Sequence, residues 1–132
     1  MQKGVARINV SAGELMDRIS ILEIKVERFT SDEKRERARR ELDDLRAVCQ
    51  EIVPEGVAIE AQFVALKEVN SNLWEVEDRL RLCEHSRTFD ESFVALARSV
   101  YRLNDRRSEI KGEINALVGS TLTEEKSYTA YR

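Results

Sequence analysis

The middle of the chain holds polar residues at helical spacing that could bind a small anion. Arg107 occupies a position where the surrounding pattern calls for an apolar side chain, and Asn70 and Asn104 fall beside it once the two segments are paired. A guanidinium donates hydrogen bonds in a planar fork that suits carboxylates and phosphates, and amides can orient such a ligand. The pattern therefore predicts a ligand-binding polar cluster made of Asn70, Trp74, Glu77, Tyr101, Asn104 and Arg107.

The same residues also suit a purely structural role. Single buried Asn or Arg residues fix the register of paired helices, and ion-pair networks between helices can resemble functional sites. A buried guanidinium without a partner costs several kcal/mol, so Arg107 should have Glu68 or another acceptor beside it. The structural network is the leading interpretation of the cluster, and an anion pocket is the alternative.

Four segments with apolar residues at alternating steps of three and four must position this cluster, and such spacing indicates amphipathic helices. Ser11 and Glu14 form a capping box before the first segment, and Thr30 and Glu33 do so before the second. Pro54 ends the second segment, since a proline cannot continue a helix interior. The sequence predicts helices over about residues 12–29, 32–53, 57–86 and 89–118.

The two long helices should form an antiparallel hairpin. Facing residues in such a hairpin have sequence numbers of constant sum, and seam residues share the sum 176, among them Cys83 with Phe93 and Val69 with Arg107. Neither shorter helix can bury its apolar stripe alone, so both should dock on the hairpin. The result is an all-α antiparallel four-helix bundle with a coiled-coil-like seam. The expected landing face carries Phe63, Trp74, Val94, Ala97 and Tyr101.

The length of the chain fits a single domain. A length of 132 residues is typical of one domain, preceded here by an extended lead-in at residues 1–10. Residues 119–132 form a tail in which Thr121 to Glu124 could start a short helix that packs Leu122 back onto the bundle.

The composition of the chain disfavours nucleic acid and membranes as partners. Charged residues make up 36% of the chain, but its net charge is only −3 and neither half is basic, so nucleic acid is an unfavoured partner. No apolar run approaches the roughly 20 residues of a membrane span, and Met1–Val10 lacks the apolar stretch of a signal peptide. Cys49 and Cys83 occupy apolar positions of the helical patterns, which fits reduced thiols. We therefore expect a cytoplasmic protein without a membrane partner.

Other reactive groups carry weaker signals. Glu14 with Asp17, and Glu75 with Asp78, each place two carboxylates on one helical face, but the remaining ligands of a metal site are not evident. His85 falls in the predicted turn and has no Ser or Cys arrangement to serve as a base. The sequence thus predicts no metal, no cofactor and no catalytic residue.

Four blocks of sequence resemble a known family. They are Val10–Lys25 (VSAGELMDRISILEIK), Asn70–Arg81 (NSNLWEVEDRLR), Ala95–Asn115 (ALARSVYRLNDRRSEIKGEIN) and Glu124–Tyr128 (EEKSY). Together they resemble a family of short bacterial proteins classified as a domain of unknown function. The resemblance implies a bacterial, cytoplasmic protein and supplies no activity.

These observations favour a helical protein–protein interaction or scaffolding module. Its exposed helix faces would bind another protein or a second copy of the chain, since the two short helices cannot cover the long ones along their whole length. The alternative is a small enzyme or anion-binding protein built around Arg107, and of the two an enzyme activity is the less favoured.

Overall fold

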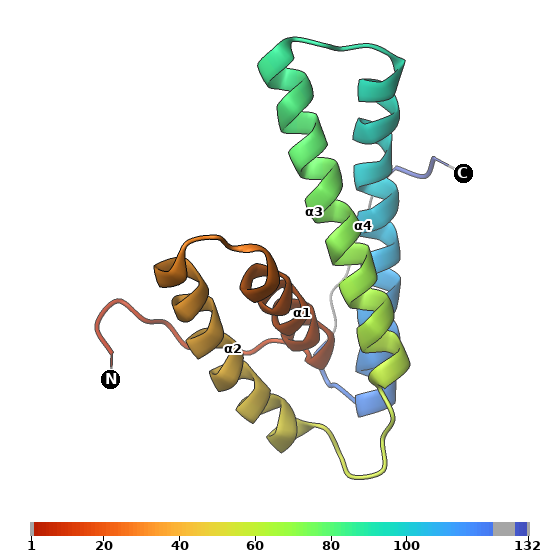
Figure 1. Cartoon of the computed structure of the whole chain (residues 1–132). Coiled ribbons are helices and arrows are strands. Elements are labelled where there is room, and N and C mark those ends of the chain that lie inside the picture. The colour runs from red at the N-terminus through yellow and green to blue at the C-terminus, as the bar shows by residue number, and fades with distance from the viewer. Residues whose placement is uncertain (1, 123–128, 132) are drawn as a thin grey trace.

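The computed structural model describes residues 2–122 and 129–131, and within them it contains four helices and no strand. The helices are α1 (Ala12–Arg28), α2 (Asp32–Ile52), α3 (Glu60–Ser86) and α4 (Glu91–Val118), as Figure 1 shows. The all-α prediction is confirmed. The largest difference in bounds is the start of α3, which is Glu60 rather than residue 57, because Pro54 and the left-handed Gly56 keep the connection non-helical for longer.

Side-chain caps begin three of the helices. The Ser11 hydroxyl accepts a hydrogen bond from the Glu14 amide at 3.1 Å, as the capping box predicts. The cap of α2 is Ser31 rather than the predicted Thr30, because the extended backbone continues for one more residue. Asp90 caps α4, and α4 ends at Gly119, whose φ of 75° is a conformation that glycine adopts without strain.

The helices form two hairpins, and α1 joins them. Helix α1 packs against each of the other three helices, whereas α2 packs chiefly on α1 (Figure 1). The core lies where α1 meets the lower half of the α3–α4 hairpin. Its buried side chains include Leu15, Met16, Ile19 and Leu22 of α1, Leu42 of α2, Leu66 and Val69 of α3, and Ile110 and Ile114 of α4.

The landing face differs from the one predicted. Phe63 packs against the core, but Val94 and Tyr101 are exposed, and the buried residues of α4 beneath α1 are Ile110 and Ile114. Helix α1 therefore docks nearer the open end of the hairpin. It docks there because Gly13 allows a close backbone approach to α4 at this point. The apolar pattern alone does not predict where along the hairpin this contact lies.

Docking at the open end leaves the other end of the hairpin uncovered. We call residues 75–102, which contain the end of α3, the turn and the start of α4, the arm. Leu82, Phe89 and Val94 on the arm are 67%, 53% and 52% exposed. In Figure 1 the arm rises above the α1–α2 hairpin without a helix beside it.

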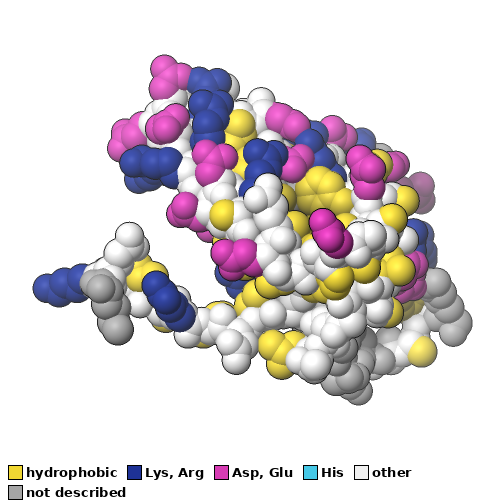
Figure 2. Space-filling view, turned by 90° about the horizontal axis from the view of Figure 1, so that it is seen from below, with side chains coloured by type: hydrophobic (Ala, Val, Ile, Leu, Met, Phe, Trp, Pro, Cys, Tyr) yellow, Lys and Arg dark blue, Asp and Glu magenta, His cyan; other side chains and the backbone are white. Residues whose placement is uncertain are grey.

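The described residues near the two ends of the chain lie outside the core. Residues 2–10 project from the helical body (Figure 2). On the face of the molecule drawn in Figure 2, acidic and basic side chains are interspersed and do not form patches of one sign. Leu122 is 43% exposed and does not pack back as predicted. The rest of the predicted tail helix, residues 123–128, lies outside the described residues.

Candidate functional site

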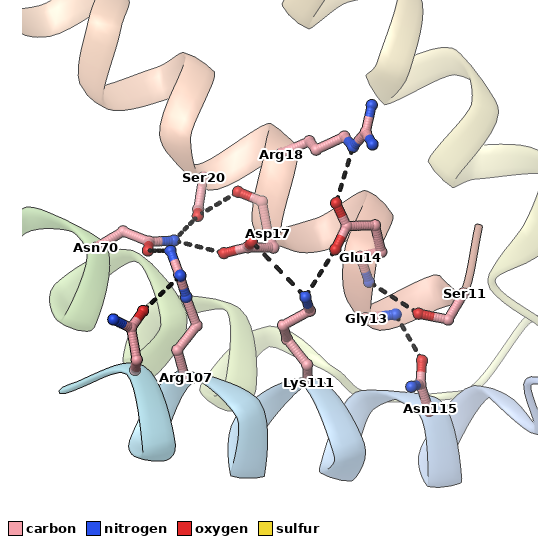
Figure 3. Close-up of polar contacts among 11 residues, drawn as sticks. Ser11, Gly13, Glu14, Asp17, Arg18, Ser20, Asn70, Arg107, Lys111 and Asn115 are labelled. Carbon is pink, nitrogen blue, oxygen red and sulfur yellow. Dashed lines mark hydrogen bonds and ion pairs between the residues drawn. The ribbon is translucent and has the colours of Figure 1, made fainter. Parts of the chain in front are cut away.

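Polar side chains from three helices meet where α1 crosses α3 and α4 (Figure 3). We call this group the polar cluster. It contains Glu14, Asp17 and Ser20 of α1, Asn70 of α3, and Asn104, Arg107, Lys111 and Asn115 of α4.

Asn70 is the centre of the cluster. Its amide nitrogen donates to Asp17 Oδ1 at 2.8 Å and to Ser20 Oγ at 2.7 Å. Its amide oxygen accepts from Arg107 Nη1 at 3.2 Å, and Arg107 Nη2 donates to Asn104 Oδ1 at 2.5 Å. Asn70 is buried, so these bonds replace the water it loses. One amide thus links three helices in a fixed orientation.

Lys111 provides a second link between α4 and α1. Its ammonium lies 2.7 Å from Glu14 Oε2 and 3.9 Å from Asp17 Oδ2, and Glu14 Oε1 also accepts from Arg18 at 2.9 Å. One cation on α4, Lys111, therefore faces two carboxylates on α1. A buried charge is tolerated when it is paired in this way.

The start of α1 touches α4 through its backbone. The Gly13 amide donates to Asn115 Oδ1 at 2.6 Å, which satisfies one of the free amides at a helix N-terminus. A β-carbon at Gly13 would lie 2.5 Å from the Lys111 carbonyl oxygen, so only glycine fits without movement. The cluster and this contact together fix where α1 docks.

The structure brings together Asn70, Asn104 and Arg107 from the predicted site. The other three predicted residues lie outside the polar cluster, since α1 crosses the hairpin below them. The Trp74 ring packs on Phe29 with a centroid distance of 6.1 Å, Glu77 bonds Arg81 on the surface, and Tyr101 contacts Tyr131.

The sequence did not predict the other five members of the cluster, which are Glu14, Asp17, Ser20, Lys111 and Asn115. A signal for the α4 members does exist: Asn104, Arg107, Lys111 and Asn115 follow one another at steps of three and four, which makes a polar stripe on one face of the helix. The α1 members carry no comparable signal, because Asp17 and Ser20 interrupt an otherwise apolar face only singly.

Arg107 differs from the other charges of the cluster. Both of its hydrogen bonds go to neutral amide oxygens, and within the described part of the chain it has no salt bridge, with Glu68 or any other carboxylate. An open groove of about 1090 Å³ lies beside it, between α4 and residues 129–131. Asn104, Ser108 and Tyr101 line this groove, and so do the carboxylates of Asp105 and Glu109.

Residues 6–131 match a family model described as a family of unknown function (DUF6165), which covers nearly the whole chain. The chain belongs to this family. The predicted membership of a family of unknown function is thereby confirmed, and it brings no characterised activity. No curated protein and no solved structure matches the chain.

Two further observations on this DUF6165 protein concern metal ions and membranes. In residues 2–122 and 129–131, no three His, Cys, Asp or Glu side chains are grouped so that they could hold a metal ion. None of the described helices combines the length and apolarity needed to cross a bilayer. The geometry of the polar cluster suits a structural link between three helices, and an open groove lies beside it at Arg107.

A separate group of ion pairs, between α3 and α1, should make the stability of this DUF6165 protein depend on pH. Lys67 on α3 lies 2.6 Å from Glu27 and 3.1 Å from Glu23 on α1. The hydrogen bond to Glu27, with a smaller contribution from Glu23, raises the pKa of Lys67 above its ordinary value of 10.5, although burial opposes the shift. The stabilisation is therefore complete below that ordinary value and is lost as pH rises through the folded-state pKa.

We expect Lys67→Gln to lower the free energy of unfolding by no more than about 1 kcal/mol at about pH 9, since the pair is near the surface. The difference from wild type should shrink as the pH approaches about 12. Urea unfolding of both proteins at the two pH values measures it. A difference that stays constant over this range would contradict the assignment.

Proposed function

We propose that this protein is an interaction module that binds a second copy of itself through the arm. The observation that supports this is a contrast in burial between the two ends of the α3–α4 hairpin. Leu66, Ile110 and Ile114 are completely buried under α1, whereas Leu82, Phe89 and Val94 on the arm are more than half exposed. Two paired helices leave apolar side chains outside their shared seam exposed. A second pair of helices can bury these side chains by completing a four-helix bundle.

The charges of the arm favour a second copy as the partner. Residues 75–86 of α3 hold four acidic and two basic residues, not counting His85, and residues 91–102 of α4 hold one acidic and two basic. Asp78 and Glu84 on α3, and Arg98 and Arg102 on α4, have no salt bridge to any residue that the structure describes. One arm therefore offers both an acidic and a basic helix.

A two-fold dimer uses both helices at once. If α3 of each copy lies beside α4 of the other, Asp78 and Glu84 meet Arg98 and Arg102 twice, which is the self-complementarity that a two-fold interface requires. Opposite charges across an interface set the partner and the register more than the raw affinity. The apolar residues of the two arms then supply the buried area.

Charge reversal on the arm provides the test. We expect the wild-type protein to sediment at twice the 15.2 kDa of one chain. Arg98→Glu with Arg102→Glu should weaken association by at least about tenfold, because two acidic helices would then meet. Asp78→Lys with Glu84→Lys should do the same with two basic helices. A mixture of the two variants should associate again, because each mixed pair restores both contacts.

The control is Arg39→Glu with Arg40→Glu, which makes the same charge change on the exposed face of α2 and should leave association unchanged. Sedimentation velocity over a range of protein concentrations reads out all five samples. A wild-type protein that stays monomeric at every concentration sinks the proposal, and so does a mixture that associates no better than either variant alone.

A second candidate function is the binding of a small anion at Arg107. It is supported by the guanidinium that bonds only neutral oxygens and faces an open groove. The carboxylates of Asp105 and Glu109 line the same groove and oppose an anion, which ranks this function below self-association.

A further inference from the structure

A second, smaller cleft lies between the end of α1 and the start of α2. Its volume is about 210 Å³. Leu22, Phe29 and Ala38 contribute its apolar side chains, and Leu22 and Ala38 are buried members of the core. Lys25, Lys34, Arg37 and Glu41 are the charged residues that line it. Apolar and cationic groups thus converge on one small space.

The charges around this cleft are poorly compensated by the protein. Lys25 and Lys34 have no salt bridge with any described residue, and Arg37 has only the exposed Glu33, at 3.4 Å. By contrast, Lys67 lies between two carboxylates, and Arg46 lies 3.2 Å from Glu23. Three cations and one carboxylate give the cleft a formal charge of +2 in a chain whose net charge is −3. Cations that converge in this way repel one another, and a bound anion removes that repulsion.

We propose that this cleft binds a phosphate monoester that carries a small apolar group. A phosphate monoester has a charge of about −1.5 to −2 at neutral pH, which matches the charge of the lining. Lysine binds phosphate as a point charge, and the arginine fork can bond two of its oxygens. The apolar side takes the organic group, since a cavity of about 150 Å³ already admits a benzene ring.

The cleft is independent of the arm. Its residues lie on α1 and α2, whereas the proposed dimer uses α3 and α4, so either proposal can fail without the other. The groove at Arg107 is also separate, because the two share no lining residue.

Titration of the full chain with phenyl phosphate, followed by amide NMR shifts, tests the proposal. We expect saturable shifts at Lys25, Phe29, Lys34 and Ala38, and none when benzyl alcohol, which lacks the charge, replaces phenyl phosphate. Lys25→Gln with Lys34→Gln should weaken binding by about tenfold, since two charge-assisted contacts are removed.

Arg40→Gln, an exposed change on the same helix outside the cleft, is the matched control and should bind as the wild type does. Circular dichroism checks that each variant is folded. Equal affinity of the double variant and the wild type would overturn the proposal. Shifts that map to Asn104, Arg107 and Ser108 instead would also overturn it, and would move the anion site to the other groove.

Discussion

Replacing Asn70 with alanine is expected to lower the free energy of unfolding by about 3 kcal/mol. The change removes two donors, to Asp17 and Ser20, and the acceptor of Arg107. The Asp17 carboxylate would then lose a partner in a place that water reaches poorly, and the Arg107 guanidinium would lose one of its two acceptors. Leaving one member of a buried charged network unbonded is more destabilising than the loss of an ordinary hydrogen bond.

Asn72→Ala is the matched control, because Asn72 is exposed on the same helix two residues away. We expect it to change stability by no more than about 0.5 kcal/mol. Urea unfolding at one fixed protein concentration compares the two variants, since self-association would make stability depend on concentration. If both variants lose the same small amount, Asn70 is not the centre of the cluster.

Gly13→Ala should also destabilise the protein, by about 2–3 kcal/mol. The new β-carbon would lie 2.5 Å from the Lys111 carbonyl oxygen and 3.0 Å from Asn115 Oδ1. The first contact is with backbone inside α4, which cannot rotate away as a side chain can. The start of α1 must therefore move outward, and the hydrogen bond from the Gly13 amide to Asn115 would be stretched or lost.

Gly112→Ala provides the opposite outcome on the facing helix. Nothing lies within 4 Å of the position that a β-carbon at Gly112 would take. Alanine favours a helix interior over glycine by about 1 kcal/mol, so this variant should be more stable than the wild type. Thermal and urea unfolding of the two glycine variants should move in opposite directions. A stabilised Gly13→Ala protein would show that α1 does not approach α4 as closely as described.

The sequence predicted the parts of this fold that depend on local periodicity. Each helix follows from apolar spacing, which repeats within the helix itself. The pairing of α3 with α4 could be predicted because the connection is short and both stripes are long. That pairing also brought Asn70, Asn104 and Arg107 together, and these are the three predicted residues that the polar cluster contains.

The sequence could not predict where α1 crosses the hairpin. That position depends on contacts between residues far apart in the chain, such as Gly13 with Asn115 and Glu14 with Lys111, which no repeat encodes. The polar face of α4 that carries Lys111 has the residue types of a solvent-exposed helix face, so its contact with α1 cannot be recognised from the sequence. Without the crossing point, the sequence groups Trp74 and Glu77 with Arg107, although α1 meets the hairpin lower down.

The position of Trp74 has a spectroscopic consequence. It is the one tryptophan of the chain, and its ring packs on Phe29 just after the end of α1, with the Arg28 guanidinium 5.9 Å from the ring centre. Its fluorescence emission therefore reports the docking of α1 on α3, whereas far-ultraviolet circular dichroism reports helix content. A state in which α1 has separated from the hairpin while the helices persist would show red-shifted emission with an unchanged dichroism spectrum.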